Sequence, residues 1–303
     1  MTSAFVDWVM GGIEQLRLLL QGVPGLYTVT ATPSLFRPFV MLIVLGIAAG
    51  LVGVIVNLRS LEFNAEAMVH SVFPGIVGGA LYGGIENIVP GAAIVAILAA
   101  IALTWINRST RINEAGTAVV LTSFFGLGVV MSLRKGDMSG QLEALMFGRL
   151  LEVSDTRMVQ SLLVCVIAML VVAVSWRAQI FRAFDRDGAQ ASGMNGAAID
   201  FLANAAIAAV VVASASAVGV LLVIGYLVVP GAAARLVGRK ISTMVVIAIV
   251  VGVAGGYLGM QFMMANLSRP VSPQAAVTLA LVAIYLLLIP VATLFEKRGW
   301  VRG

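Results

Sequence analysis

The sequence predicts an all-α, polytopic membrane protein built as a bundle of about nine spanning helices. Of its 303 residues, 60% are hydrophobic and only 11% are charged, and the mean hydropathy is +1.04. The chain also divides into apolar segments of about 20 residues, the length that crosses a hydrocarbon core of about 30 Å. Such a composition excludes an ordinary soluble domain.

The predicted spans follow one another with short polar connections between them. The stretches near Ile88, Leu145 and Val218 are also compatible with half-helices or re-entrant segments, which are tolerated where protein buries the backbone. The predicted number of spans therefore lies between eight and ten. The apolar runs cover residues 35–57, 66–84, 88–106, 115–133, 159–175, 199–217, 218–237, 243–263 and 273–295.

Basic side chains predict the orientation of the bundle. Most of the 19 Lys and Arg residues fall in connections on one side, which the positive-inside rule assigns to the cytoplasm. An odd number of spans then places the N-terminus outside and the C-terminus inside. The same residues are spread over short loops rather than gathered on one soluble face, so the net charge of +5 does not indicate a nucleic-acid partner.

The chain divides into three predicted regions. Residues 1–33 mix charged with apolar side chains, which is too polar for a span and suits an extracytoplasmic helix that lies in the membrane interface. Residues 34–296 form the transmembrane domain, and residues 297–303 form a cytoplasmic tail. The longest cytoplasmic connection covers about residues 176–198 and has a helical pattern.

Two ionisable side chains that can bind a metal fall within the second predicted span. Glu66 and His70 are four residues apart, so on an α-helix they lie on the same face. Ionisable groups in hydrocarbon are costly and normally face a wet cavity or the bundle interior, where they mark a transport path. A carboxylate with an imidazole suits Mn²⁺, Zn²⁺ or Fe²⁺, whereas Mg²⁺ and Ca²⁺ favour oxygen alone. The alternative is a neutral structural histidine that is hydrogen-bonded to a neighbouring helix.

The same span continues with a proline and regularly spaced glycines. Pro74 removes a backbone hydrogen bond and predicts a kink just beyond His70. Gly75, Gly79 and Gly83 have the small-xxx-small spacing that lets another helix approach closely. This helix is therefore a candidate gate wall, with ordinary helix packing as the simpler interpretation.

No phosphate-binding loop of the type G-x-x-x-x-G-K-[ST] occurs in the sequence, and no polar stretch is long enough for a nucleotide-binding domain. The chain alone is therefore not predicted to be an enzyme. Energy for transport must come from a separate ATPase subunit or from an ion gradient.

Five segments, in the same order along the chain, resemble the permease subunit of ABC importers for manganese, zinc and iron. The first two are E-A-M-V-H-S-V-F-P-G from Glu66 and E-A-G-T-A-V-V-L-T-S-F-F-G-L-G from Glu114, in which glutamate stands where that family usually has aspartate. The others are L-M-F-G-R-L-L from Leu145, F-D-R-D-G-A-Q-A-S-G from Phe184 and G-V-L-L-V-I-G-Y-L-V-V-P-G-A-A-A-R-L from Gly219.

The resemblance implies a type II-like permease that imports a divalent metal into the cytoplasm by alternating access. It implies a homodimer of this chain in the bacterial cytoplasmic membrane, two copies of an ATP-binding subunit, and an extracytoplasmic metal-binding lipoprotein that delivers the ion. The metal is cargo, and no permanently bound cofactor is expected. The residues so implied are Glu66, His70 and Glu114 for the metal path, Pro74, Gly75 and Gly79 for the gate or packing, and Phe184, Asp185, Ala189 and Gly193 for ATPase coupling.

Two other functions stay open on the sequence. A permease of the same architecture could carry a metal chelate or another solute. The intramembrane ionisable residues also fit a secondary transporter that is driven by protons or sodium without an ATPase. Co-purification of an ATP-binding subunit would discriminate this last function from the first two.

Overall fold

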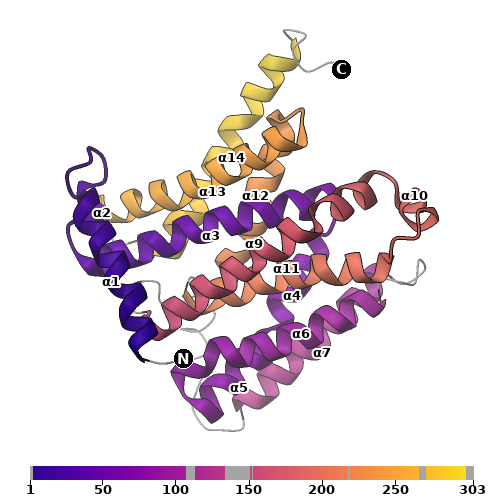
Figure 1. The fold of residues 1–303 in the computed structure, drawn as a ribbon, viewed down its shortest axis with the longest axis horizontal. Coiled ribbons are helices and arrows are strands. Elements are labelled where there is room, and N and C mark those ends of the chain that lie inside the picture. The colour runs from indigo at the N-terminus through magenta and orange to yellow at the C-terminus, as the bar shows by residue number, and fades with distance from the viewer. Residues whose placement is uncertain are drawn as a thin grey trace.

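A computed structural model describes most of the chain as a bundle of helices (Figure 1). Every regular element in the described part is helical, which confirms the predicted all-α class. The structure describes residues 3–106, 113–133, 151, 153–217, 219–265 and 271–297. Its helices are α1 (Ser3–Leu20), α2 (Tyr27–Thr30), α3 (Pro33–Leu58), α4 (Glu62–Ser71), α5 (Phe73–Gly83), the 3₁₀ helix η1 (Ile85–Asn87), α6 (Ile88–Ile106), α7 (Asn113–Leu133), α9 (Asp155–Phe184), α10 (Arg186–Ala191), α11 (Gly196–Ala217), α12 (Val220–Val237), α13 (Ile241–Met264) and α14 (Pro273–Lys297).

Seven helices of the described chain are long and apolar enough to cross a membrane, namely α3, α6, α7, α9, α11, α13 and α14. The predicted number of about nine is therefore not confirmed. The predicted span 66–84 is two short helices, α4 and α5, because Pro74 has no amide hydrogen with which to continue the first one. The predicted span 218–237 corresponds to α12, whose apolar part, Leu222–Val237, is shorter than the seven.

Helix α9 is longer than the apolar run that predicts it. It begins at Asp155, where the Oγ of Ser154 accepts a hydrogen bond from the backbone amide of Arg157 as an N-cap. It continues to Phe184, well beyond residue 175, where the apolar run ends. The additional C-terminal turns carry Arg177, Gln179 and Arg182 among apolar side chains, and the contacts of Gln179 and Arg182 with α11, described below, stabilise them.

Helix α3 is the central element of the bundle and passes between α13 and α9 (Figure 1). Its glycines let α13 approach the backbone closely. A Cβ on Gly46 would lie only 2.8 Å from the carbonyl carbon of Gly252, and a Cβ on Gly50 only 3.0 Å from that of Ala248. Within lipid no hydrophobic force drives helices together, so close packing at small residues is a main source of attraction between them.

Helices α5, α6 and α7 form a second group that lies against α4 and α11 (Figure 1). A Cβ on Gly75 would lie 2.5 Å from the carbonyl oxygen of Gly91, and Gly79 approaches the backbone of Asn87 even more closely. The predicted small-residue stripe therefore packs against α6. Gly128 of α7 lies against Pro74, since a Cβ there would be 2.9 Å from the proline nitrogen.

The N-terminal region is held on the outside of this bundle. Val6 and Met10 of α1 are buried against Met158 and Val159 of α9, whereas Trp8 on another face of α1 is largely exposed. This amphipathic pattern agrees with the predicted interfacial helix, although the placement in a membrane stays a prediction.

Helices α3 and α9 run side by side in the same direction and are joined by charges at both ends. At their N-terminal ends, the Nη1 of Arg37 lies 2.6 Å from the Oδ1 of Asp155. At their C-terminal ends, Arg59, Gln179 and Arg182 meet Asp200 of α11 or one another. We refer to these four residues as the Asp200 cluster.

Candidate metal path and coupling segment

The predicted metal-binding pair lies on α4, which places Glu66 and His70 one helical turn apart on one face. The side chain of Glu66 is exposed in the single chain, and that of His70 is partly buried. The imidazole meets the ring of Phe125 edge-on, with ring centroids 5.5 Å apart and planes at 81°. Phe125 also contacts Phe73, so α7 covers one side of the histidine.

The junction between α4 and α5 follows directly after His70. Helix α4 ends at Ser71, and α5 begins at Phe73 with Pro74 in its first turn, where the missing amide hydrogen costs nothing. The amides of Gly75 and Ile76 both bond to the carbonyl of Val72, which starts the new helix. The predicted kink is therefore a helix break. That Pro74, Gly75 and Gly79 act as a gate stays a prediction.

Glu114 lies apart from the Glu66–His70 pair. It is exposed in the first turn of α7, whereas the contact with His70 is made by Phe125, eleven residues or about 16 Å further along the same helix. No group of three or more His, Cys, Asp or Glu side chains that could hold a metal occurs in the part of the chain that the structure describes. One copy of the chain thus offers two adjacent candidate metal ligands, and Glu114 lines a separate cavity with Asn64 and Thr117.

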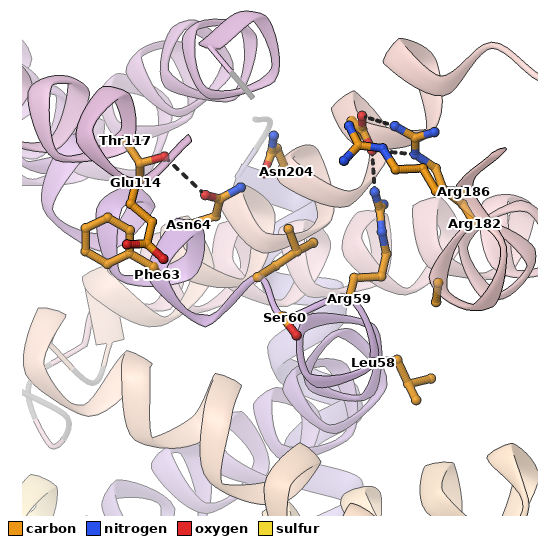
Figure 2. Close-up of a pocket in the computed structure, with 13 residues that line it drawn as sticks. Leu58, Arg59, Ser60, Phe63, Asn64, Glu114, Thr117, Arg182, Arg186 and Asn204 are labelled. Atoms are coloured by element: carbon orange, nitrogen blue, oxygen red, sulfur yellow. Dashed lines mark hydrogen bonds and ion pairs between the residues drawn. The ribbon is translucent and has the colours of Figure 1, made fainter. Parts of the chain in front are cut away.

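This cavity has a volume of about 440 Å³ and lies near the C-terminal ends of α3 and α9. Figure 2 shows its two sides. Glu114, Thr117 and Asn64 lie on one side, where the Oγ1 of Thr117 donates to the Oδ1 of Asn64 at 3.4 Å. Arg59 and Arg182 lie on the other side.

The Asp200 cluster forms the charged wall of this cavity. The Nε and Nη2 of Arg182 donate to the two carboxylate oxygens of Asp200 at 2.9 and 2.6 Å, and Arg59 donates to the first of them. Arg59 also donates to the Oε1 of Gln179 at 2.5 Å, while the Nε2 of Gln179 donates to the carbonyl of Ile199 at 2.9 Å. Burial lowers the pKa of the Arg59 guanidinium, and the hydrogen bond with Asp200 opposes that shift.

The predicted coupling segment contains the short helix α10. Asp185 caps this helix, since its Oδ1 accepts from the amide of Gly188 at 2.7 Å. Ala189 is buried, Phe184 is exposed at the end of α9, and Gly193 has a positive φ of 76° just after the helix. The helical pattern predicted for this connection is confirmed, and the contact of these residues with an ATPase subunit stays a prediction.

The sequence interpretation did not find the Asp200 cluster. It assigned Arg59 and Arg182 to membrane topology and gave Asp200 no role. Asp200 lies 141 residues from Arg59 and 18 from Arg182 in the chain, so only the packing of α3, α9 and α11 brings them together. The polar extension of α9 beyond its apolar run was the available signal, because such an extension needs partners.

Comparison with known proteins identifies the family. Residues 31–292 match the ABC 3 transport family over most of the chain. The chain belongs to this family. The match confirms the resemblance seen in the sequence and the multi-pass membrane location. It leaves out the first 30 residues, which carry α1 and α2.

Individual relatives agree with this assignment. The manganese transport system membrane protein MntC of Listeria monocytogenes is 29% identical over 73% of this chain and 78% of its own length. The chelated iron transport system membrane protein YfeD of Yersinia pestis is 30% identical over 76% of each chain. A chain in the structure of PsaBC from Streptococcus pneumoniae in complex with Fab has the same fold, with a TM-score of 0.77, 24% identity, and coverage of 90% of this chain and 98% of the other.

One of the five segments of the sequence resemblance, L-M-F-G-R-L-L from Leu145, lies outside the described residues except for Leu151.

Proposed function

We propose that this chain is the permease subunit of an ATP-driven importer that moves a divalent transition metal, Mn²⁺, Zn²⁺ or Fe²⁺, into the cytoplasm. The observation that carries the proposal is a carboxylate and an imidazole on one face of α4 in a chain of the ABC 3 transport family. Oxygen and nitrogen ligands together suit these metals. The names of the relatives, which concern manganese and chelated iron, agree with this cargo class.

The proposed topology has nine crossings. The broken helix pair α4–α5 and the helix α12 add two crossings to the seven long apolar helices. Short and broken helices cross membranes where neighbouring protein covers the freed backbone groups, and α4 and α12 both pack within the bundle. With the basic residues inside, the N-terminus and α1 lie outside, and α10 lies in the cytoplasm. The membrane is the bacterial cytoplasmic membrane.

Two copies of the chain form the proposed pore. An exposed carboxylate within a membrane domain needs a wet path or a second protein surface, and Glu66 is exposed in the single chain. A twofold axis beside α4 would bring together two Glu66–His70 pairs. Two ligands from each copy, completed by water, bind an ion weakly enough for it to leave again, as transport requires.

Hydrolysis of ATP belongs to a separate subunit in this proposal. Two copies of an ATP-binding subunit would contact this cytoplasmic turn through Phe184, Asp185 and Gly193, while the buried Ala189 packs α10 against the rest of the chain. A binding lipoprotein would deliver the ion to the outer face. Alternating access follows if the ATP-driven movement of α10 changes which side of the α4–α5 junction is open, with Pro74, Gly75 and Gly79 at the moving contact with α6 and α7.

A metal chelate is the second candidate cargo, because the relative YfeD is named for chelated iron. In that case Glu66 and His70 would contact the ligands of the complex rather than a bare ion. The fold and the partners would be unchanged.

The test is uptake by liposomes that contain the chain with its ATP-binding subunit and binding protein. Liposomes with wild type, His70→Ala or Glu66→Gln are supplied with external Mn²⁺, Zn²⁺ or Fe²⁺, one ion at a time. Glu86→Gln serves as a control at an exposed acidic residue outside α4. We expect uptake of at least one free ion, which falls at least about tenfold in both α4 variants and not in the control. Normal uptake by well-folded His70→Ala would remove the metal role. ATP turnover with uptake of the chelate alone would favour the second cargo.

A further inference from the structure

We propose that the Asp200 cluster links the coupling segment to helix α4, so that Arg59, Arg182 and Asp200 are positioning residues for transport. This inference rests on the proposed function, because it concerns how a movement of α10 reaches the Glu66–His70 pair. It assigns a role to residues that touch neither the cargo nor the ATPase subunit.

The first link closes the base of the loop that carries α10. Arg182 precedes this short helix and Asp200 follows it, and their two hydrogen bonds form a fork across the base. Beside the fork, Gln179 donates to the carbonyl of Ile199. Because the two ends of the loop are joined at its base, a displacement of α10 moves the C-terminal end of α9 and the N-terminal end of α11 together.

The second link attaches this base to the turn before α4. Arg59 is the C-cap of α3 and donates to both Asp200 and Gln179. Only Ser60 and Leu61 separate it from the start of α4 at Glu62. Along the chain, Glu66 and His70 therefore follow Arg59 by about two and three helical turns.

The turn itself transmits displacement because it is tight and held on both sides. Ser60 has a φ of 53°, in the left-handed region that a residue with a side chain rarely occupies, and the amide of Leu61 bonds to the carbonyl of Val56 at 2.8 Å. On the opposite side, Arg235 of α12 donates to the carbonyl of Asn57 at 3.2 Å. A turn fixed in this way cannot absorb a shift of Arg59 by bending freely.

The surroundings of the Asp200 cluster allow its side chains to move, which a cluster that only joined the helices would not require. Its charged side chains, Arg59, Arg182 and Asp200, line the cavity of about 440 Å³, so Arg59 can change position without displacing packed neighbours, which a close-packed interior would prevent. Buried ion pairs are also poor fasteners, since apolar residues of similar volume often stabilise as well or better. A cluster that only joined three helices would not need charges beside a cavity.

The experiment measures ions transported per ATP hydrolysed by the complete complex in liposomes. Arg59→Gln cuts the link to α3 and leaves the Arg182–Asp200 fork intact, and Arg182→Gln cuts the fork. Arg37→Gln, the same substitution at the other end of α3, is the matched control. We expect ATP turnover close to wild type in Arg59→Gln, with a ratio of ions to ATP that falls at least about fivefold, and an unchanged ratio in Arg37→Gln.

Two further readouts decide the proposal. The double variant Arg59→Gln/Arg182→Gln should have a ratio no lower than the worse single variant, because the two links act in series. Arg59→Lys keeps the charge but has no second nitrogen with which to donate to both Gln179 and Asp200. It tests the case in which Arg59→Gln fails to assemble, with a ratio of ions to ATP below wild type expected. An unchanged ratio in either folded Arg59 variant would overturn the proposal. Absence of ATP-driven uptake by the wild type would instead overturn the proposed function, before any variant is compared.

Discussion

Both ends of the α3–α9 pair are joined by ion pairs between arginine and aspartate, but the two sites differ in how deeply they are buried. At one end, the Arg37 and Asp155 side chains are 40% and 46% exposed and share a single bond. At the other end, Arg59, Arg182 and Asp200 are only 8–12% exposed, and one carboxylate accepts from two guanidiniums. Water reaches both partners of the outer pair, whereas the charges of the Asp200 cluster are neutralised mainly by one another. The buried end therefore depends on each of its charged partners, and the exposed end only adds attraction.

Removal of the Asp200 carboxylate is expected to have the largest effect on stability. Asp200→Asn keeps the size of the side chain but leaves two buried guanidiniums without a counterion. Breaking a buried charge cluster from one side costs about 3–5 kcal/mol. The measurement is thermal or denaturant unfolding of the purified chain in detergent. A loss below about 1 kcal/mol would mean that water enters the cavity and replaces the carboxylate, and that the two ends are not different in kind.

The same substitution at the exposed end should cost far less. Asp155→Asn removes the partner of Arg37, and exposed ion pairs contribute about 0.2–1 kcal/mol. This small contribution should also disappear as salt is raised to about 1 M, because the screening length then falls to about 3 Å. The check is the difference in melting temperature between wild type and Asp155→Asn at low and high salt. An effect that is insensitive to salt would show that the ion pair with Arg37 is not the source of the contribution.

The sequence predicted the features of the fold that depend on local composition. Apolar length predicted the long helices, and the pattern around Asp185 predicted the helix α10. Pro74 predicted a kink just beyond His70, where the structure has a break between two helices. The number of spans was not confirmed, because the lengths of α4, α5 and α12 depend on breaks at Val72 and Gly219 whose consequences only packing decides.

Contacts that depend on how neighbouring helices are shifted along their axes were not predictable from the sequence. Glu114 was a candidate partner for Glu66 and His70, yet the structure brings Phe125 to the histidine and leaves Glu114 beside Asn64 and Thr117. Helix-wheel reasoning places residues around one axis and gives no register between two helices. The same limitation hid the Asp200 cluster, whose members come from three helices.

The smallest expected effect lies at the exposed end, where α1 adds a second ion pair. Glu14 accepts hydrogen bonds from Arg17, which itself donates to the carbonyl of Thr30 at 2.8 Å. The hydrogen bond from Arg17 holds the pKa of Glu14 below its ordinary value of 4.5. Because the folded-state pKa is the lower one, this contact stabilises the folded chain fully above about pH 4.5, and the contribution is lost as the pH falls through the pKa of the folded state.

The comparison of wild type with Glu14→Gln isolates this contribution. At neutral pH the wild type should melt higher by about one degree or less, since the Glu14 side chain is 43% exposed. The difference should shrink towards zero as the pH is lowered through the pKa of the folded state, because the protonated carboxyl group resembles the amide. A difference that persists in acid would mean that the substitution acts through something other than the charge of Glu14. The exposed end of the α3–α9 pair would then depend on charge even less than its accessibility indicates.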